Sequence, residues 1–134
     1  MTNMANTSTT YHVWFATKRR KWLLQGDIDQ TAKDLIREVA SEKGISIIEC
    51  DTAIDHVHLL LRLHPHQTLS KVMNLIKGIS SRKLHLAFPE LKLDSHSHHF
   101  WQRGYNFKIV EPGSLTTRRQ YVRTQKERLE KFER

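Results

Sequence analysis

Cysteine, long apolar runs and acidic residues are all scarce or missing in this sequence of 134 residues. The one cysteine, Cys50, excludes an internal disulfide framework and fits a reducing cytoplasm; we expect it to be buried and inert. No apolar run reaches the length that spans a membrane. The first ten residues also lack the charged start and apolar block of a signal peptide. We therefore expect a cytoplasmic protein with no membrane partner.

The shortage of acidic residues leaves the chain strongly basic. Lys and Arg total 22 against 14 for Asp and Glu, a net charge of +8. This excess favours a polyanionic partner, nucleic acid first, over a merely basic surface. Hydrophobic residues make up 38% of the chain, which is too many for a disordered protein and enough for one modest core. We expect a flexible leader at residues 1–10 and a single domain at residues 11–134.

Hydrophobic periodicity and turn signals predict four strands and three helices. The strands are expected at residues 11–17, 45–50, 56–63 and 105–110, and the helices at residues 29–44, 68–88 and 114–131. The order β-α-β-β-α-β with an appended C-terminal helix predicts an α+β, ferredoxin-like fold, in which two helices cover one face of an antiparallel sheet. The first and third strands form the central pair of that sheet.

The third expected strand carries two histidines, His56 and His58, at the front of a hydrophobic run. Side chains of a strand alternate between its faces, so both imidazoles would share one face. The odd positions 57–63 are wholly apolar and would face the core. Imidazole is a common ligand of divalent metals. The pattern therefore predicts two candidate metal ligands side by side on a central strand of the sheet, where they would be held rigidly.

The last expected helix carries Tyr121 and Gln125, which lie one turn apart on one face. A glutamine can offer its carbonyl oxygen to a metal, and a tyrosine can attack phosphorus once its proton is lost or shared. His56, His58 and Gln125 would supply three neutral ligands to one divalent ion. That ion would keep its full charge and polarise a phosphate oxygen of DNA. Tyr121 would be the catalytic nucleophile held near that phosphorus.

Basic residues on the second and last helices are expected to contact DNA rather than only to be solvated. These residues are Lys77, Arg82, Lys83, Arg118, Arg119 and Arg123. The remaining histidines carry less information. We interpret His12 and His85 as incidental and the pair His64 and His66 as structural or solvated. The cluster His96, His98 and His99 stays open between a second metal site and a solvated loop.

Several stretches resemble a known family. Asp55–Leu60 resembles the His-hydrophobic-His signature of HUH endonucleases, and Tyr121–Gln125 resembles the single-tyrosine helix of their smallest transposase branch, the TnpA enzymes of the simplest bacterial insertion sequences. Lys77–Arg82 and Trp101–Tyr105 resemble stretches of the same branch. The resemblance covers residues 11–126, nearly the whole chain.

This resemblance implies a metal-dependent tyrosine transposase that uses Mg²⁺ or Mn²⁺. Such an enzyme cuts and rejoins single-stranded DNA at insertion-sequence ends through a 5′-phosphotyrosine and recognises nearby imperfect hairpins. It also implies a homodimer, in which the tyrosine helix of one subunit often completes the site of the other. The repeat-associated (REP) tyrosine transposases, which retain the motif but serve the host, are implied as close relatives.

Two other functions stay open from the residues alone. A non-catalytic hairpin-binding module of the same ferredoxin-like fold would bind nucleic acid without a metal, although no aromatic RNA-recognition strand is visible. A hydrolytic nuclease would use the same metal site with water and would form no protein–DNA bond. The sequence also leaves open whether the active site is assembled within one chain or across two.

Overall fold

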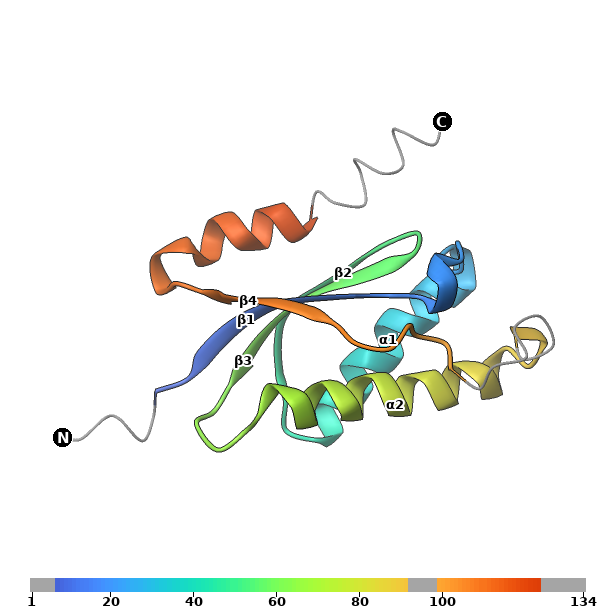
Figure 1. The fold of residues 1–134 in the computed structure, drawn as a ribbon, viewed down its shortest axis with the longest axis horizontal. Helices are drawn as coiled ribbons and strands as arrows, with labels where there is room; N and C mark the ends of the chain where they lie inside the picture. The colour runs from blue at the N-terminus through green and yellow to red at the C-terminus, as the bar shows by residue number, and fades with distance from the viewer. Residues whose placement is uncertain (1–6, 92–98, 124–134) are drawn as a thin grey trace.

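The computed structural model describes residues 7–91 and 99–123 of the chain, and Figure 1 shows one antiparallel sheet with helices on both faces. Its strands lie in the order β2-β3-β1-β4. Their bounds are β1 Thr9–Ala16, β2 Ser46–Ala53, β3 His56–Leu63 and β4 Asn106–Val110. The helices are α1 Gly26–Glu42, α2 Leu69–Ala87 and the C-terminal helix, residues 115–123, with short 3₁₀ turns η2 Lys18–Arg20 and η3 Pro112–Ser114. The predicted α+β fold, with the first and third strands at its centre, is confirmed.

Helices α1 and α2 lie side by side on one face of the sheet (Figure 1). The odd-numbered residues of β3 point into this layer, as their apolar character predicts. Val57, Leu59 and Leu61 are completely buried there, together with Ile36 of α1 and Met73 of α2. This layer is the main hydrophobic core, and its close packing keeps the two central strands rigid.

The C-terminal helix lies on the opposite face of the sheet (Figure 1). Its Val122 is fully buried in a small cluster with Leu60 of β3 and Val110 of β4. Within residues 115–123 this buried contact is small, but it still fixes which side of the helix faces the sheet. None of the described helices is long and apolar enough to cross a membrane.

Several element boundaries differ from the predictions, and strand β1 begins at Thr9, two residues before its expected start and inside the expected leader. Helix α1 begins at Gly26, three residues before the expected start at Asp29. Asp29 lies inside the first turn, where it is buried and accepts a hydrogen bond from the Thr52 hydroxyl, so a tertiary contact explains the acid at this position. Strand β2 continues to Ala53, three residues beyond its expected end at residue 50, because Ala53 still pairs with His56 of β3.

Candidate active site on the open face of the sheet

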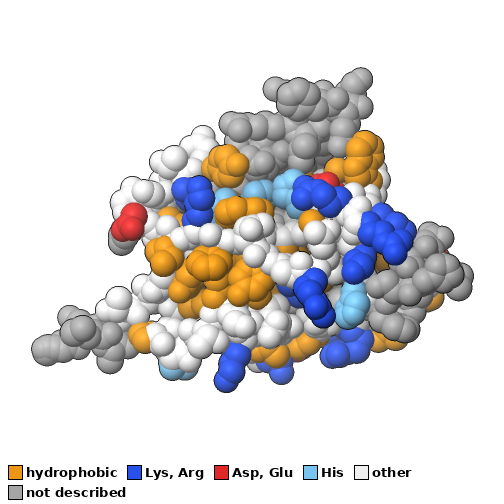
Figure 2. All heavy atoms as spheres, in the orientation of Figure 1, with side chains coloured by type: hydrophobic (Ala, Val, Ile, Leu, Met, Phe, Trp, Pro, Cys, Tyr) orange, Lys and Arg blue, Asp and Glu red, His pale blue; other side chains and the backbone are white. Residues whose placement is uncertain are grey.

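The even-numbered residues of the two central strands lie on the face opposite the main core. In the register of β1 and β3, Trp14 pairs with His58 and Ala16 pairs with His56. These residues line an open cleft of about 470 Å³ that Tyr121 of the C-terminal helix also borders. Figure 2 shows histidine side chains on the visible surface, flanked by lysine and arginine side chains.

Tyr121 lies over the imidazoles of its own chain. The centroid of its ring is 5.9 Å from that of His12 and 6.2 Å from that of His58, in edge-to-face orientations. The side chain is 41% exposed, so solvent or a substrate can reach the phenol. The predicted nucleophile and the predicted histidine ligands therefore meet within one subunit.

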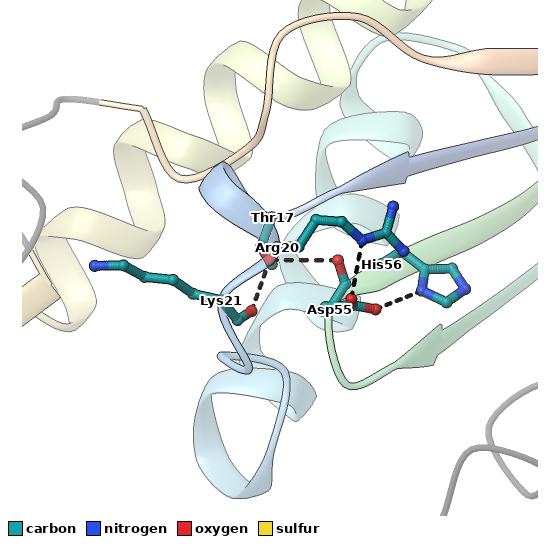
Figure 3. A network of polar contacts seen from close by, with 5 residues as sticks. All are labelled: Thr17, Arg20, Lys21, Asp55 and His56. Atoms are coloured by element: carbon teal, nitrogen blue, oxygen red, sulfur yellow. Dashed lines mark hydrogen bonds and ion pairs between the residues drawn. The ribbon is translucent and has the colours of Figure 1, made fainter.

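His56 is anchored by a carboxylate. Its Nδ1 lies 2.7 Å from Oδ1 of Asp55, and Oδ2 of Asp55 accepts a hydrogen bond from Nε of Arg20 at 3.1 Å (Figure 3). Burial raises the pKa of Asp55, but its hydrogen bond with His56 and the charge of Arg20 outweigh that effect and hold the pKa below its usual value. An ionised Asp55 keeps the ring proton on Nδ1 and leaves Nε2 of His56 with its lone pair.

The turn that carries Asp55 is itself fixed to the end of β1. The backbone N–H of Thr17 donates to the Asp55 carbonyl at 2.9 Å, and the Thr17 hydroxyl donates to the Lys21 carbonyl at 2.7 Å (Figure 3). These bonds tie the loop that carries Arg20 to the turn that begins β3. The anchor of His56 is therefore built from segments that are far apart in the sequence.

His58 is held by a second histidine instead of a carboxylate. Its Nδ1 lies 2.9 Å from Nε2 of His12 on the neighbouring strand. Burial lowers the pKa of His58 to about 3, with the charge of His56 adding to the effect, and burial likewise lowers the pKa of His12 to about 4. Both rings are therefore neutral at pH 7, as a metal-binding imidazole must be.

The open nitrogen of His58 fits a metal ligand. Its Nε2 is buried and has no hydrogen-bond partner in the part of the chain that the structure describes. Buried polar atoms are normally paired, so this orphaned nitrogen is available to accept a ligand. Across residues 7–91 and 99–123 there is no group of three or more His, Cys, Asp or Glu side chains that could hold a metal. Two imidazoles therefore need a further donor, and the predicted one, Gln125, lies outside the described residues.

Only some of the basic residues predicted to contact DNA line a cleft. Arg118 borders the cleft at Tyr121, and Arg82 borders a second cleft of about 880 Å³ beside α2. Lys83 forms an ion pair with Glu38 of α1, where it links the two helices. Arg119 and Arg123 both form ion pairs with Glu49 of β2 and so hold the C-terminal helix to the sheet.

Lys77 lines the second cleft and also contacts the loop that borders it. Its ammonium donates to the carbonyls of Gln102 and Gly104, and it lies 5.5 Å from the centroid of the Phe15 ring. Burial lowers the pKa of this amine. Lys77 therefore anchors the loop of residues 102–105, which separates the two clefts and borders both of them.

The sequence reading missed several residues of the site. His12 was interpreted as incidental, and this was wrong, because His12 is buried and bonded to His58. The alternation of β1 beside β3 was the signal that could have revealed it. Three further basic residues that line the main cleft, Arg20, Arg103 and Lys108, were also missed. No carboxylate side chain is among the described residues that line it. His64 and His66 form a stacked pair away from the site, and His96 and His98 lie outside the described residues.

Comparisons with known proteins agree on one family. The family model described as "Transposase IS200 like" matches residues 5–125. The ISDra2 transposase TnpA of Deinococcus radiodurans is 30% identical over 115 residues, which cover 86% of this chain and 82% of that protein. The transposase for insertion sequence element IS200 of Salmonella typhimurium is 33% identical over 100 residues, which cover 75% of this chain and 66% of that protein.

Two solved structures share the fold. A crystal structure of a candidate transposase from Deinococcus radiodurans R1 superposes with a TM-score of 0.75 at 27% identity, over 93% of this chain and 96% of that one. A REP-associated tyrosine transposase bound to a REP hairpin superposes with a TM-score of 0.65 at 13% identity, over 92% of this chain and 70% of that one. At that identity the second structure supports the fold alone.

Proposed function

The chain belongs to the IS200-like transposase family, and from that membership we propose that it cuts and rejoins single-stranded DNA at insertion-sequence ends through a 5′-phosphotyrosine at Tyr121. The observation that supports this most is the position of the Tyr121 ring over His12 and His58 in a basic cleft. A structural tyrosine has no need for two adjacent neutral imidazoles or for a cationic lining.

The proposed chemistry is a balanced exchange of phosphodiester bonds. The phenolic oxygen of Tyr121 attacks phosphorus, a tyrosine–phosphate bond forms, and the bond to the 3′-oxygen breaks. The phenol gives up its proton, and the departing 3′-oxygen takes one up. Because one phosphodiester replaces another, a free 3′-hydroxyl can reverse the step and rejoin strands without ATP.

We propose that His56, His58 and Gln125 hold Mg²⁺ or Mn²⁺. Support comes from the two anchored rings, since Asp55 occupies Nδ1 of His56 and His12 occupies Nδ1 of His58. This leaves the two Nε2 atoms for a ligand. A bound divalent cation would supply Lewis-acid polarisation of a phosphate oxygen. The role of the chain is to present neutral donors in fixed orientations beside Tyr121.

The substrate path that we propose crosses both clefts. Arg20, Arg103, Lys108 and Arg118 line the main cleft and can neutralise the phosphates of a single strand. The loop of residues 102–105 borders this cleft and the one beside α2, so one strand can pass from Tyr121 to Arg82. From membership of this family we also propose an imperfect hairpin as the neighbour of the cleavage site.

We also propose that the protein acts as a homodimer through β4. This strand is at the edge of the sheet, and its Phe107 and Ile109 side chains are 50% and 58% exposed. Figure 2 shows a hydrophobic patch over this strand. An exposed apolar edge strand favours pairing with a second strand. Two subunits, each with its own Tyr121, would supply the two cleavages that excision needs.

A labelled single strand carrying the ends of the element, incubated with full-length protein and Mn²⁺, tests the proposal. We expect a covalent adduct with the wild-type protein and none with Tyr121→Phe. Tyr11→Phe, on the other face of the sheet, is the matched control and should retain the adduct. An adduct formed by Tyr121→Phe would refute the assigned nucleophile. Cleavage without any adduct would favour a hydrolytic nuclease, and binding without cleavage would favour a hairpin-binding module.

A further inference from the structure

The hydrogen bond between His12 and His58 bears on which nitrogen of His58 has a lone pair that a cation could bind. The rings are joined through Nε2 of His12 and Nδ1 of His58 at 2.9 Å, and His12 is only 2% exposed. A neutral imidazole has one N–H donor and one acceptor nitrogen. Between these two rings, therefore, one must donate and the other must accept.

The direction of this bond decides whether His58 can be a ligand. If Nδ1–H of His58 donates to His12, then Nε2 of His58 carries a lone pair and can bind a cation. If Nε2–H of His12 donates instead, then Nε2 of His58 carries a proton and cannot bind one. In the described part of the chain neither Nε2 of His58 nor Nδ1 of His12 has a hydrogen-bond partner, so the bond between the two rings is the contact that couples their tautomers.

We propose that His12 is a positioning residue that accepts the Nδ1–H of His58 and so keeps the Nε2 of His58 open toward the cation. This inference rests on the metal site of the proposed function. It gives each ligand its own anchor: Asp55 for His56, and His12 for His58. Unlike a carboxylate, the imidazole of His12 brings no negative charge, so it orients His58 without weakening the attraction of the cation for a phosphate.

The packing around His12 suits this role. Its ring lies 5.0 Å from the ring of Trp14 and 5.9 Å from that of Tyr121, centroid to centroid. Strand β1, which carries it, pairs with β3 on one side and β4 on the other. A residue held by a central strand and two aromatic neighbours has little freedom to turn, so it can hold a second ring in one orientation.

The tautomer of His58 can be measured in the metal-free, full-length protein. Two-bond ¹H–¹⁵N correlation spectra of histidine-labelled protein distinguish Nδ1–H from Nε2–H rings. We expect the Nδ1–H form for His58 in the wild type. In His12→Asn, whose side chain is too short to reach, we expect the Nε2–H form or a mixture. An Nε2–H ring in the wild type, or an unchanged ring in His12→Asn, would overturn the proposal.

Mn²⁺ affinity, followed by the electron paramagnetic resonance of free Mn²⁺, gives a second readout. Loss of an outer partner of a ligand typically weakens metal binding about 10–100-fold, and we expect this for His12→Asn. His12→Gln should restore most of the affinity, because its amide oxygen can take the place of the accepting Nε2. His64→Gln, in the exposed pair after β3, is the control and should leave the affinity unchanged.

The tautomer spectra and the Mn²⁺ affinities test the positioning role of His12 separately from the metal site on which it rests. Equal affinities in the wild type, His12→Asn and His12→Gln would refute the positioning role while leaving the metal site intact. A wild-type protein that binds no Mn²⁺ would refute the metal site, and the spectra would still decide whether His12 sets the tautomer. Folding of each variant is checked by the dispersion of the same spectra, and recovery in His12→Gln excludes a merely structural defect in His12→Asn.

Discussion

The two faces of β3 differ in almost every property although their residues alternate along one strand. On the helix side, Leu59 and Leu61 are completely buried under α1 and α2. On the open side, His56 and His58 border a basic cleft under a single helix. One face supplies the stability that lets the other present polar, unsatisfied groups. Stability and chemistry are therefore separated by the period of two in a strand.

The two faces are also covered with unequal strength. A continuous core closes the helix side, whereas the C-terminal helix is held by the small cluster around Val122 and by the ion pairs of Arg119 and Arg123 with Glu49. Exposed ion pairs contribute about 0–1 kcal/mol each. We therefore expect the helix that carries Tyr121 to open locally at a lower free energy than the main core.

The largest expected effect is on the helix side. Leu59→Ala should lower the free energy of unfolding by about 2–5 kcal/mol, because it leaves a cavity in a completely buried position. Urea denaturation followed by circular dichroism measures this. Arg62→Ala, on the exposed side of the same strand, is the control and should change stability by less than about 0.5 kcal/mol. Similar losses in both variants would contradict the division between the faces.

The pH dependence of stability tests the open face. Unfolded histidines take up protons near pH 6.5, but His12 and His58 in the folded protein resist protonation down to about pH 4 and 3. Between these values the unfolded state binds more protons, so the free energy of unfolding should fall as the pH falls, on the order of 2 kcal/mol for each of the two histidines from pH 7 to 4.5. Urea titrations at several pH values check this. His12→Gln should show a shallower dependence, and an unchanged slope would argue against the buried pair as its source.

A smaller, local effect is expected in the C-terminal helix. Val122→Ala removes part of its buried contact with Leu60 and Val110 and should cost about 1–2 kcal/mol. Amide hydrogen exchange should accelerate roughly tenfold at residues 115–123, while α2 stays protected. Gln120→Ala, exposed on the same helix, should leave exchange unaltered. Equal acceleration in α2 would show that the helix opens only with the whole domain.

The smallest effect is expected from the ion pairs. Glu49→Gln should destabilise the C-terminal helix by about 0–1 kcal/mol at low salt, because it removes the shared partner of Arg119 and Arg123. The difference from wild type should shrink as salt screens the charges. Hydrogen exchange at two salt concentrations measures it, and a difference that grows with salt would contradict an electrostatic origin.

The same division explains what could be predicted from the sequence. The faces of β3 follow from local alternation, so the buried odd-numbered positions 57–63 and the shared face of His56 and His58 were predictable. The start of α1 was not, because Asp29 serves a hydrogen bond with Thr52 of β2 rather than a helix cap. Such a contact depends on strand placement, which local signals do not contain.

The site residues that could not be predicted from the sequence also depend on contacts between segments far apart in the chain. His12 reaches His58 only because β1 pairs with β3, across 46 residues of sequence. Lys77 looks like a solvated helix residue until the loop that supplies the carbonyls of Gln102 and Gly104 is placed beside it. Residue type and spacing predicted the chemistry that we propose for the site, and the strand order placed His12 beside His58.

The central claim is that the open face gathers one cation site from His56 and His58 beside Tyr121. Its most direct test is the anomalous difference density of a crystal of the full-length protein grown with Mn²⁺. We predict one peak that contacts the Nε2 atoms of both histidines, next to the Tyr121 ring. A saturated crystal whose Mn²⁺ lies elsewhere, for example at His64 and His66, with none at the central pair, would contradict the account.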